Sequence, residues 1–229
     1  MITTDKVYHN RETYYHYKED DRLGGHDPYS ASKACAELII DSFRNSFFNP
    51  ANYSQHQKSV SAARAGNVIG GGDWAPDRII PDIIRALNAD KEVQVRNPLS
   101  VRPWQHVLDP LFGYLVLAAH QSINGAGFAD AFNFGPYEEG NFTVEQLVNE
   151  AIQIWGKGKY HTPGSKDQPH EAGLLHLDIN KALTNLDWTP KLNSVKAIER
   201  TVEWYKAFLV DGKDASQLIE QDIKEYTAL

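Results

Sequence analysis

The stretch "DPYSASKACAELIID", residues 27–41, decides the fold of this chain. Asp27 can cap a helix whose first position holds a proline, because an aspartate side chain accepts hydrogen bonds from free amides and proline needs no amide donor there. We predict a helix from this cap to about Phe48, with apolar residues over a wide arc. The helix places Tyr29 four residues before Lys33, so the two side chains share one face.

Strand-like and helix-like segments alternate around this helix. Strands are predicted where β-branched, aromatic or small apolar residues run together, in residues 1–8, 59–70, 92–97 and 130–135. Helices are predicted from apolar periodicity in residues 77–90, 107–123, 143–156, 194–210 and, more polar, near the C-terminus. In the third of these, Thr143 is the predicted cap and Gly156 the predicted stop. The alternation favours an α/β fold with a mainly parallel sheet, and residues 9–26 form a predicted loop.

Charge and cysteine content exclude several classes of protein. The 23 basic residues against 30 acidic ones give a net charge of -7, which argues against a nucleic-acid partner. No apolar run has the length of about 20 residues that a membrane helix needs, and the first residues lack a signal-peptide pattern. The single Cys35 excludes an internal disulfide and fits a reducing compartment. We therefore predict a cytoplasmic protein that binds neither membrane nor nucleic acid.

The Tyr29 and Lys33 spacing has two interpretations. A lysine ammonium beside a tyrosine stabilises the phenolate, and such a tyrosine can take a proton from a sugar hydroxyl while hydride leaves the same carbon. Alternatively, the two are surface residues one turn apart. Tyr14 and Lys18 show the same spacing in the predicted loop, so spacing alone does not decide between the two.

The stretch "TTDK", residues 3–6, places three chemically different groups together. Thr4, Asp5 and Lys6 supply a hydroxyl donor, a carboxylic acid and an amine, which are the groups that an elimination across a carbon–carbon bond requires. Ligands bind at the ends of parallel strands in open α/β sheets. The alternative is a strand end that turns into a polar loop.

Candidate ligand-binding residues follow in the middle of the chain. "RAGNVIGGGD", residues 64–73, lacks the Lys-Ser/Thr ending of a phosphate-binding loop, so it predicts a tight turn with Asn67 as a polar contact. Arg78, Arg96 and Arg102 carry guanidinium groups that match phosphate oxygens. Each of these arginines has the alternative of a solvated surface position.

"PHEAGLLHLD", residues 169–178, gathers His170, Glu171, His176 and Asp178. The stretch has neither the His-x-x-x-His nor the Glu-x-x-His spacing that places metal ligands on one helix face. We therefore predict no metal site here.

Taken in order along the chain, these motifs resemble the extended short-chain dehydrogenase/reductase family. The resemblance includes "TTDKVYHN", "DPYSASKACAEL", "RAGNVIGGGDWAPDRIIPD", "VRNPLSVRPWQHVLDPL" and "HEAGLLHLDINKA". Within the family it points to the 4,6-dehydratases that act on CDP-glucose, because "NVIGGGDW" and "RPWQHVL" are characteristic of that branch. Lys6 also fits this branch, since the related dTDP-glucose enzymes usually carry glutamate there.

The resemblance implies a fold and two regions. The fold would be a partial Rossmann-like parallel sheet, without its N-terminal strands, and a smaller α+β region. Residues 1–75 would be the C-terminal part of an NAD-binding domain. Residues 76–229 would mainly bind the nucleotide-sugar, with some segments returning to the sheet. The product would enter deoxysugar biosynthesis for lipopolysaccharide.

The resemblance also implies residue roles, with NAD as the hydride carrier. Tyr29 would deprotonate the 4-hydroxyl of the glucose with help from Thr4, and Lys33 would hold the nicotinamide ribose. Lys6 would remove the proton at C5, and Asp5 would protonate the departing C6 hydroxyl. The nucleotide-sugar would be bound by Asn67, Arg78, Arg96, Arg102 and His170.

The sequence departs from the family at its start. None of the 16 glycines forms the Gly-x-x-Gly-x-x-Gly or Gly-x-Gly-x-x-Gly pattern that binds the dinucleotide pyrophosphate. Family members carry about 130 further residues ahead of "TTDK", within the usual dinucleotide domain of two βαβαβ halves. We therefore expect this chain alone to bind NAD weakly or not at all and to turn over no substrate.

Other possibilities stay open at this point. The chain could derive from a nucleotide-sugar epimerase, although epimerases need no acid and base for an elimination. It could also be a non-catalytic module that binds a nucleotide-sugar. Family members often dimerise through the helix that bears the tyrosine and lysine, so a homo-oligomer is possible.

Overall fold

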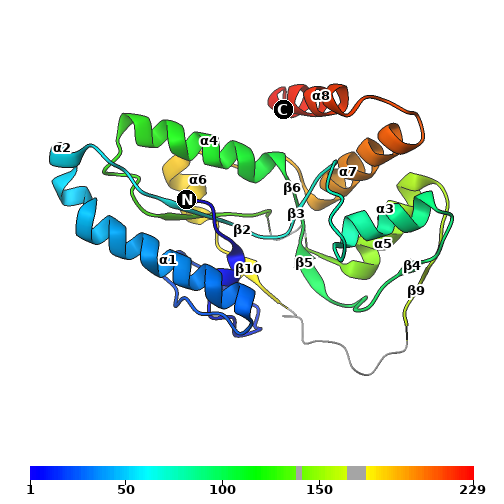
Figure 1. Cartoon of the computed structure of the whole chain (residues 1–229), viewed down its shortest axis with the longest axis horizontal. Coiled ribbons are helices and arrows are strands. Elements are labelled where there is room, and N and C mark those ends of the chain that lie inside the picture. The colour runs from blue at the N-terminus through cyan, green and yellow to red at the C-terminus, as the bar shows by residue number, and fades with distance from the viewer. Residues whose placement is uncertain (138–140, 164–173) are drawn as a thin grey trace. The chain divides into compact units, whose positions relative to one another are not determined.

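The structure is a computed structural model that describes residues 1–137, 141–163 and 174–229 (Figure 1). It divides into two compact units, each built from three separate stretches of the chain. Unit 1 comprises Met1–Gly66, Asp109–Gly135 and Leu174–Pro190. Unit 2 comprises Asn67–Leu108, Pro136–Gly173 and Lys191–Leu229. Within the described residues, no helix is both long and apolar enough to pass through a bilayer.

Parallel strands form the centre of unit 1. Strand β2 (Ala62–Ala65) pairs in parallel with β7 (Ala131–Phe134), and every residue of both strands is buried. On the other edge of β2, Ile2 forms a parallel bridge with Ala63, whose amide and carbonyl both bond to the first residues of the chain. Parallel strands buried on both faces are typical of α/β folds, so the predicted fold class is confirmed.

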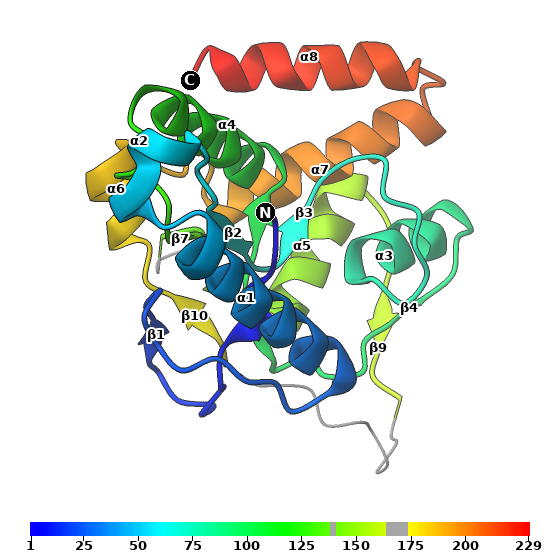
Figure 2. The same cartoon turned by 60° about the vertical axis from the view of Figure 1, so that its left-hand side comes forward.

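Helices cover both faces of this sheet. Ala63, Ala65 and the two phenylalanines of β7 pack against α4 (Leu108–Ile123) and α6 (Asn180–Leu186). Because side chains alternate along a strand, Arg64 faces the other way, toward α1 (Pro28–Phe47). Figures 1 and 2 show α1 and α4 on opposite sides of β2.

The remaining elements of unit 1 are short. Two residues of the predicted loop form a strand, β1 (His16–Tyr17), which pairs in parallel with β10 (His176–Leu177). The others are η1 (Asp5–Val7), η2 (Pro50–Asn52) and α2 (Tyr53–His56). The amide nitrogen of the Asn133 side chain donates to the Tyr17 carbonyl (2.9 Å), so that β7 is tied to β1. A loop predicted from polar composition therefore contains a paired strand.

Unit 2 has its own core and, among its described residues, three short strand pairs. The parallel pairs are β3 (Val68–Ile69) with β6 (Gln105–His106) and β4 (Val93–Gln94) with β9 (Tyr160–His161). An antiparallel pair joins β5 (Val101–Pro103) and β8 (Asn141–Thr143). Its helices are α3 (Ile79–Asn88), α5 (Val144–Trp155), α7 (Ser194–Leu209) and α8 (Ala215–Thr227). All four of these helices contribute apolar side chains to one buried cluster.

Helix α5 shows how local sequence sets its ends. The Thr143 hydroxyl accepts from the Gln146 amide (3.1 Å), and the Gln146 side chain accepts from the Thr143 amide (2.8 Å). The two bonds form a capping box. Gly156 ends the helix at a φ of 94°, which favours glycine. The predicted cap and stop are both confirmed.

Candidate active site

Thr4, Asp5 and Lys6 lie where the chain leaves its pairing with β2. The Thr4 hydroxyl donates to Asp5 Oδ1 (2.9 Å) and accepts from the Lys6 amide (3.4 Å), which caps η1. Thr4 and Asp5 are buried, and Lys6 is exposed. The strand predicted through residues 1–8 is therefore reduced to isolated bridges at Ile2 and Tyr8, because the Thr4 side chain caps a 3₁₀ helix that begins at Asp5.

Tyr29 and Lys33 lie at the start of α1. Asp27 caps this helix by accepting from the Ser30 amide (3.0 Å), and hydrogen bonds from Ser30 lower the pKa of Asp27. The cap orders the first turn, which carries Tyr29, and it confirms the predicted helix start. Tyr14 and Lys18, which have the same spacing, do not lie on a helix.

The side-chain nitrogens of two lysines lie near the ring of Tyr29. Lys33 Nζ lies 5.8 Å from the ring centroid and Lys6 Nζ lies 6.0 Å from it. Cations are attracted to an aromatic face at about this distance. Tyr29 is 51% exposed, so its ring is open to a ligand. The structure thus brings the tyrosine of α1 together with the lysine of "TTDK", which come from different elements.

Gly66, at the end of β2, leaves the space that Asp5 occupies. A Cβ atom at Gly66 would lie 2.7 Å from Asp5 Oδ2, closer than such atoms approach in folded proteins. Strand β2 therefore sets where the buried carboxyl group lies.

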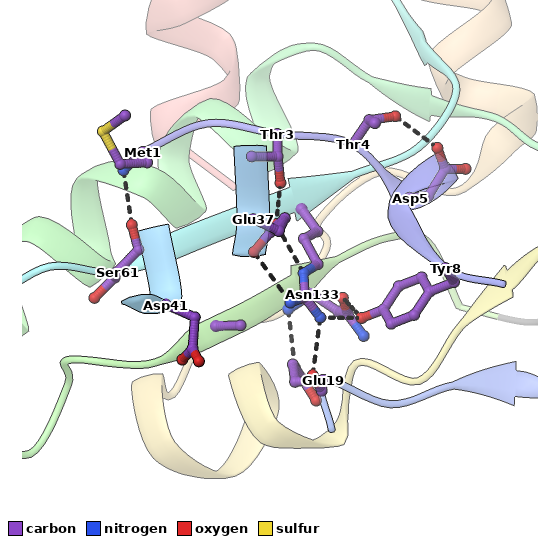
Figure 3. A network of polar contacts seen from close by, with 12 residues as sticks. Met1, Thr3, Thr4, Asp5, Tyr8, Glu19, Glu37, Asp41, Ser61 and Asn133 are labelled. Carbon is purple, nitrogen blue, oxygen red and sulfur yellow. Dashed lines mark hydrogen bonds and ion pairs between the residues drawn. The ribbon is translucent and has the colours of Figure 1, made fainter. Parts of the chain in front are cut away.

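A buried ion pair joins helix α1 to strand β2 (Figure 3). Arg64 on β2 donates from Nε to Glu37 Oε1 (2.9 Å) and from Nη2 to Glu37 Oε2 (3.1 Å). The Thr3 hydroxyl donates to the same Oε1 atom (2.5 Å), and Arg64 Nη1 donates to the Tyr8 hydroxyl (2.7 Å). Burial is the largest single influence on the pKa of Arg64 and lowers it, but the interactions with Glu37 and Tyr8 together outweigh burial and raise the pKa. The pKa of Tyr8 is raised by burial, with Arg64 acting in the opposite direction.

The described residues among those predicted to bind the nucleotide-sugar lie in unit 2. Arg78 Nη1 is 3.3 Å from Asp73 Oδ2, and Arg96 Nη2 is 3.3 Å from Asp77 Oδ1, so both arginines reach the same loop. All four side chains are at least partly exposed, which leaves these pairs open to solvent.

The other two described members of this set are half-buried. Asn67 precedes β3, and its carbonyl accepts from the Gln105 amide (3.0 Å). Arg102 lies on β5, where its Nη1 donates to the Val101 carbonyl (3.4 Å). His170 lies outside the described residues. The predicted set is therefore divided, with the groups for chemistry in unit 1 and the described arginines in unit 2.

Sequence reasoning did not single out Thr3, Glu37 or Arg64. A signal was present in "SAARAG", because an arginine in a strand predicted to be buried needs a carboxylate partner. Glu37 follows Lys33 by four residues, as Lys33 follows Tyr29, so it is an acidic residue on the same face of the helix.

Comparison with known proteins identifies relatives over nearly the whole chain. A family model described as GDP-mannose 4,6 dehydratase matches residues 1–201. The CDP-glucose 4,6-dehydratase of Salmonella typhimurium is 48% identical over 225 residues, which are 98% of this chain and 62% of that protein.

Solved structures show the same fold. A dTDP-glucose 4,6-dehydratase from Bacillus anthracis, in complex with NAD, has a TM-score of 0.69 at 26% identity, covering 90% of this chain and 60% of that one. A UDP-glucuronic acid 4-epimerase from Bacillus cereus, in complex with UDP-glucuronic acid and NAD, has a TM-score of 0.74 at 22% identity over the same shares. The chain thus spans less than two thirds of the length of each relative.

Proposed function

We propose that this chain, which belongs to the GDP-mannose 4,6 dehydratase family, carries the catalytic groups of a CDP-glucose 4,6-dehydratase. The reaction would convert CDP-glucose into CDP-4-keto-6-deoxyglucose and water. Membership of the extended short-chain dehydrogenase/reductase family, predicted from the motifs, is confirmed by these relatives. The choice of CDP-glucose rests on the 48% identity to the Salmonella enzyme and on Lys6 in "TTDK".

One observation carries the proposal: Lys6 Nζ and Lys33 Nζ both lie near the ring of Tyr29. Lys6 belongs to η1, whose cap Thr4 donates its hydroxyl to the Asp5 carboxyl. An oxidation at C4 needs a base for the hydroxyl proton. An elimination at C5 and C6 needs a second base and an acid. The five side chains supply this set, whereas an epimerase does not need the second base and the acid.

Tyr29 accepts the proton of the C4 hydroxyl in its phenolate form, which the nearby ammonium of Lys33 stabilises. Thr4 hydrogen-bonds the same sugar oxygen. The resulting 4-ketone acidifies C5, so that Lys6, in its neutral amine form, can remove the C5 proton and return it to C5 when hydride adds at C6. Asp5 gives a proton to the C6 hydroxyl, which leaves as water.

NAD, when bound, takes the hydride from C4 and returns it at C6. The exposed Tyr29 and the half-buried Lys33 fit the nicotinamide ribose end, because hydroxyl and ammonium groups there can hydrogen-bond ribose hydroxyls. The sequence has no glycine motif for the pyrophosphate. Asn67, Arg78, Arg96, Arg102 and His170 are proposed to bind the nucleotide-sugar, because arginine forks match diphosphate oxygens. We also propose a cytoplasmic location, in keeping with the single cysteine.

The test is incubation with CDP-glucose and NAD, followed by the alkaline ultraviolet absorbance of a 4-keto-6-deoxy sugar. Because the chain lacks a glycine motif, two forms are assayed. The first is the chain alone, and the second is the chain preceded by the glycine-loop portion of the Salmonella relative. We expect product in the second form. Replacing Tyr29 by phenylalanine should lower the rate about 10²–10⁴-fold, because it removes the general base.

Tyr14→Phe is the matched control, since Tyr14 has the same spacing to a lysine and is 83% exposed. It should leave the rate unchanged. An isomerised sugar without the absorbance would instead identify an epimerase. Nucleotide-sugar binding that is unaffected by Tyr29→Phe, without turnover in either form, would identify a binding module.

A further inference from the structure

Glu37 lies on the same face of α1 as the candidate catalytic pair. It follows Tyr29 by eight residues and Lys33 by four, a spacing that aligns side chains along a helix. Glu37 is nevertheless 3% exposed, although glutamate is rarely buried unless it is paired. The proposed reaction assigns this carboxylate no chemical step.

The partners of Glu37 come from two other elements of unit 1. The guanidinium of Arg64 on β2 binds both carboxylate oxygens, at 2.9 and 3.1 Å, a two-pronged geometry that fixes orientation as well as distance. The Thr3 hydroxyl donates to Oε1 at 2.5 Å. Figure 3 shows Thr3 and Glu37 pointing toward one another, with Thr4 and Asp5 following along the chain.

The other donors of Arg64 are also occupied. Its Nη1 atom donates to the Tyr8 hydroxyl (2.7 Å) and to the Glu19 carbonyl (3.0 Å). The Tyr8 hydroxyl in turn donates to Asn133 Oδ1 on β7 (2.7 Å). A buried network in which each member is satisfied holds its side chains in one arrangement. Glu37 is therefore fixed against the sheet rather than against a mobile surface group.

We propose that Thr3, Glu37 and Arg64 form a clamp that sets the position of the η1 residues relative to Tyr29. Glu37 fixes α1 to β2 through Arg64, and through Thr3 it fixes the residue that immediately precedes Thr4. The catalytic meaning of the clamp rests on the proposed function, whereas its geometry does not.

The test compares two substitutions at Thr3. Thr3→Val keeps the shape, removes the hydroxyl and leaves the buried ion pair intact, whereas Thr3→Ser keeps the hydroxyl. In the active form described above, Thr3→Val should lower kcat by about 10–100-fold, since displacements near 1 Å cost about that much. The KM for CDP-glucose should stay within about twofold of the parent, because the substrate-binding residues are untouched. Thr3→Ser should restore most of kcat.

A second readout needs no turnover. Amide hydrogen exchange, measured by NMR on this chain, reports local opening of a segment. Thr3→Val should speed exchange at Lys6 and Tyr8, the amides of the η1 turn, about fivefold or more, with α7 amides of unit 2 unchanged. Thr3→Ser should resemble the parent.

Unchanged exchange at these amides in Thr3→Val would overturn the clamp, whatever the activity. Equal loss of kcat in the valine and serine variants would overturn its positioning role. If the parent forms no product while the exchange pattern is as expected, the proposed function fails and the clamp stands. The two proposals therefore fail separately.

Discussion

At the scale of single residues, the absence of a side chain at Gly66 matters as much as the side chains present. Asp5 is 4% exposed, and its carboxyl group lies against the backbone of Gly66 at the end of β2. The proposed role of Asp5, as an acid that gives a proton to the substrate, depends on a fixed position of this buried carboxyl group. Any side chain at Gly66 would compete with Asp5 for the same space.

We expect Gly66→Ala to lower the free energy of unfolding by about 1–3 kcal/mol, the usual cost of overpacking a buried site. A methyl group 2.7 Å from Asp5 Oδ2 must displace the carboxyl group, so turnover should fall as well. Urea denaturation measures the first effect and the dehydration assay the second.

Gly135→Ala is the control for this change. A Cβ atom there makes only ordinary contacts, the nearest 3.5 Å away, so stability should change by less than about 1 kcal/mol. Equal destabilisation by the two variants would show that Gly66 has no special role for Asp5.

The residues of the candidate site divide into those that the sequence could reveal and those that it could not. Tyr29 and Lys33 were singled out by their spacing together with the Asp-Pro cap and the ordered motifs of the family resemblance, because spacing alone did not separate them from Tyr14 and Lys18. Lys6 was singled out by its place in "TTDK". Their meeting at one ring required the tertiary structure, because η1 and α1 are separated by a long loop. Glu37 and Arg64 were missed because a helix pattern does not show what the facing strand carries.

At the scale of elements, the caps decide where the site helices begin. Asp27→Ala should lower the free energy of unfolding by about 1 kcal/mol, the usual cost of losing such a cap. Turnover should also fall, because Tyr29 lies in the turn that frays. The pKa of Asp27 is lowered by Ser30, so the cap stabilises at pH values above the ordinary pKa of 3.8 and is lost as pH falls through the folded value.

Asp214→Ala provides the comparison. Asp214 caps α8 by accepting from the amides of Ser216 (2.9 Å) and Gln217 (3.1 Å). It should also lower stability, by about 1 kcal/mol, but leave turnover unchanged. Denaturation and activity of both variants are measured side by side. A loss of stability without loss of turnover in Asp27→Ala would contradict the link between the cap and Tyr29.

Strand β6 and helix α8 are joined through a buried histidine. The pKa of His106 is lowered from 6.5 to about 4, mainly by burial and in smaller part by Arg200. Asp222 on α8, 3.5 Å away, acts in the opposite direction. His106 is therefore neutral at pH 7 in the folded chain. The unfolded chain takes up a proton first as pH falls, so stability decreases from about pH 6.5 down to about pH 4.

Between pH 7.5 and pH 5, this histidine should account for a loss of roughly 2 kcal/mol in the free energy of unfolding. Urea denaturation of the parent and of His106→Gln at both pH values isolates its share from that of the other histidines. The variant should lose less stability over this range than the parent. Identical pH dependence in the two proteins would show that His106 does not titrate differently on folding.

Elements with local signals were predicted well. Helices α1 and α5 were found with their caps, because the capping residues lie next to the helices that they cap. The strands β1 and β10 were not found as a pair, because two-residue strands exist only through partners that are distant in sequence. The apolar pattern of α1 also does not show which side is buried: Leu38 and Ile39 are 59% and 58% exposed, whereas Glu37 is buried.

At the scale of the whole molecule, the chain interleaves its two units. The predicted regions, residues 1–75 and 76–229, place the first division near the structural one at Gly66 and Asn67. Two later stretches, Asp109–Gly135 and Leu174–Pro190, belong to unit 1. The family resemblance implied that some segments return to the sheet, but composition alone does not show which ones, because strands of both units look alike in sequence. The assignment of NAD binding and substrate binding to these regions stays a proposal.

Binding of NAD is the prediction that belongs to this scale. Without a glycine motif, no set of backbone amides in the sequence is designated for the pyrophosphate. We expect isothermal titration of this chain with NAD to give a dissociation constant weaker than about 0.1 mM, or no measurable heat. Titration of the form preceded by the glycine-loop portion is the control and should give tighter binding. A micromolar constant for the chain alone would contradict the prediction.

The pairing of His16 with His176 and of Ala62 with Ala131 has a consequence for biosynthesis. Synthesis runs from the N-terminus, so Tyr29 and its helix leave the ribosome long before β7 and β10 exist. Pairings between distant residues form slowly because a long loop must close first. During that interval, the elements that later pack against β2 and α1 are missing, so the apolar surfaces of β2 and α1 are exposed. Exposed apolar surface promotes aggregation. The yield of folded protein should therefore depend strongly on chaperones and on the speed of translation. The free energy of unfolding of the finished protein does not reveal this dependence.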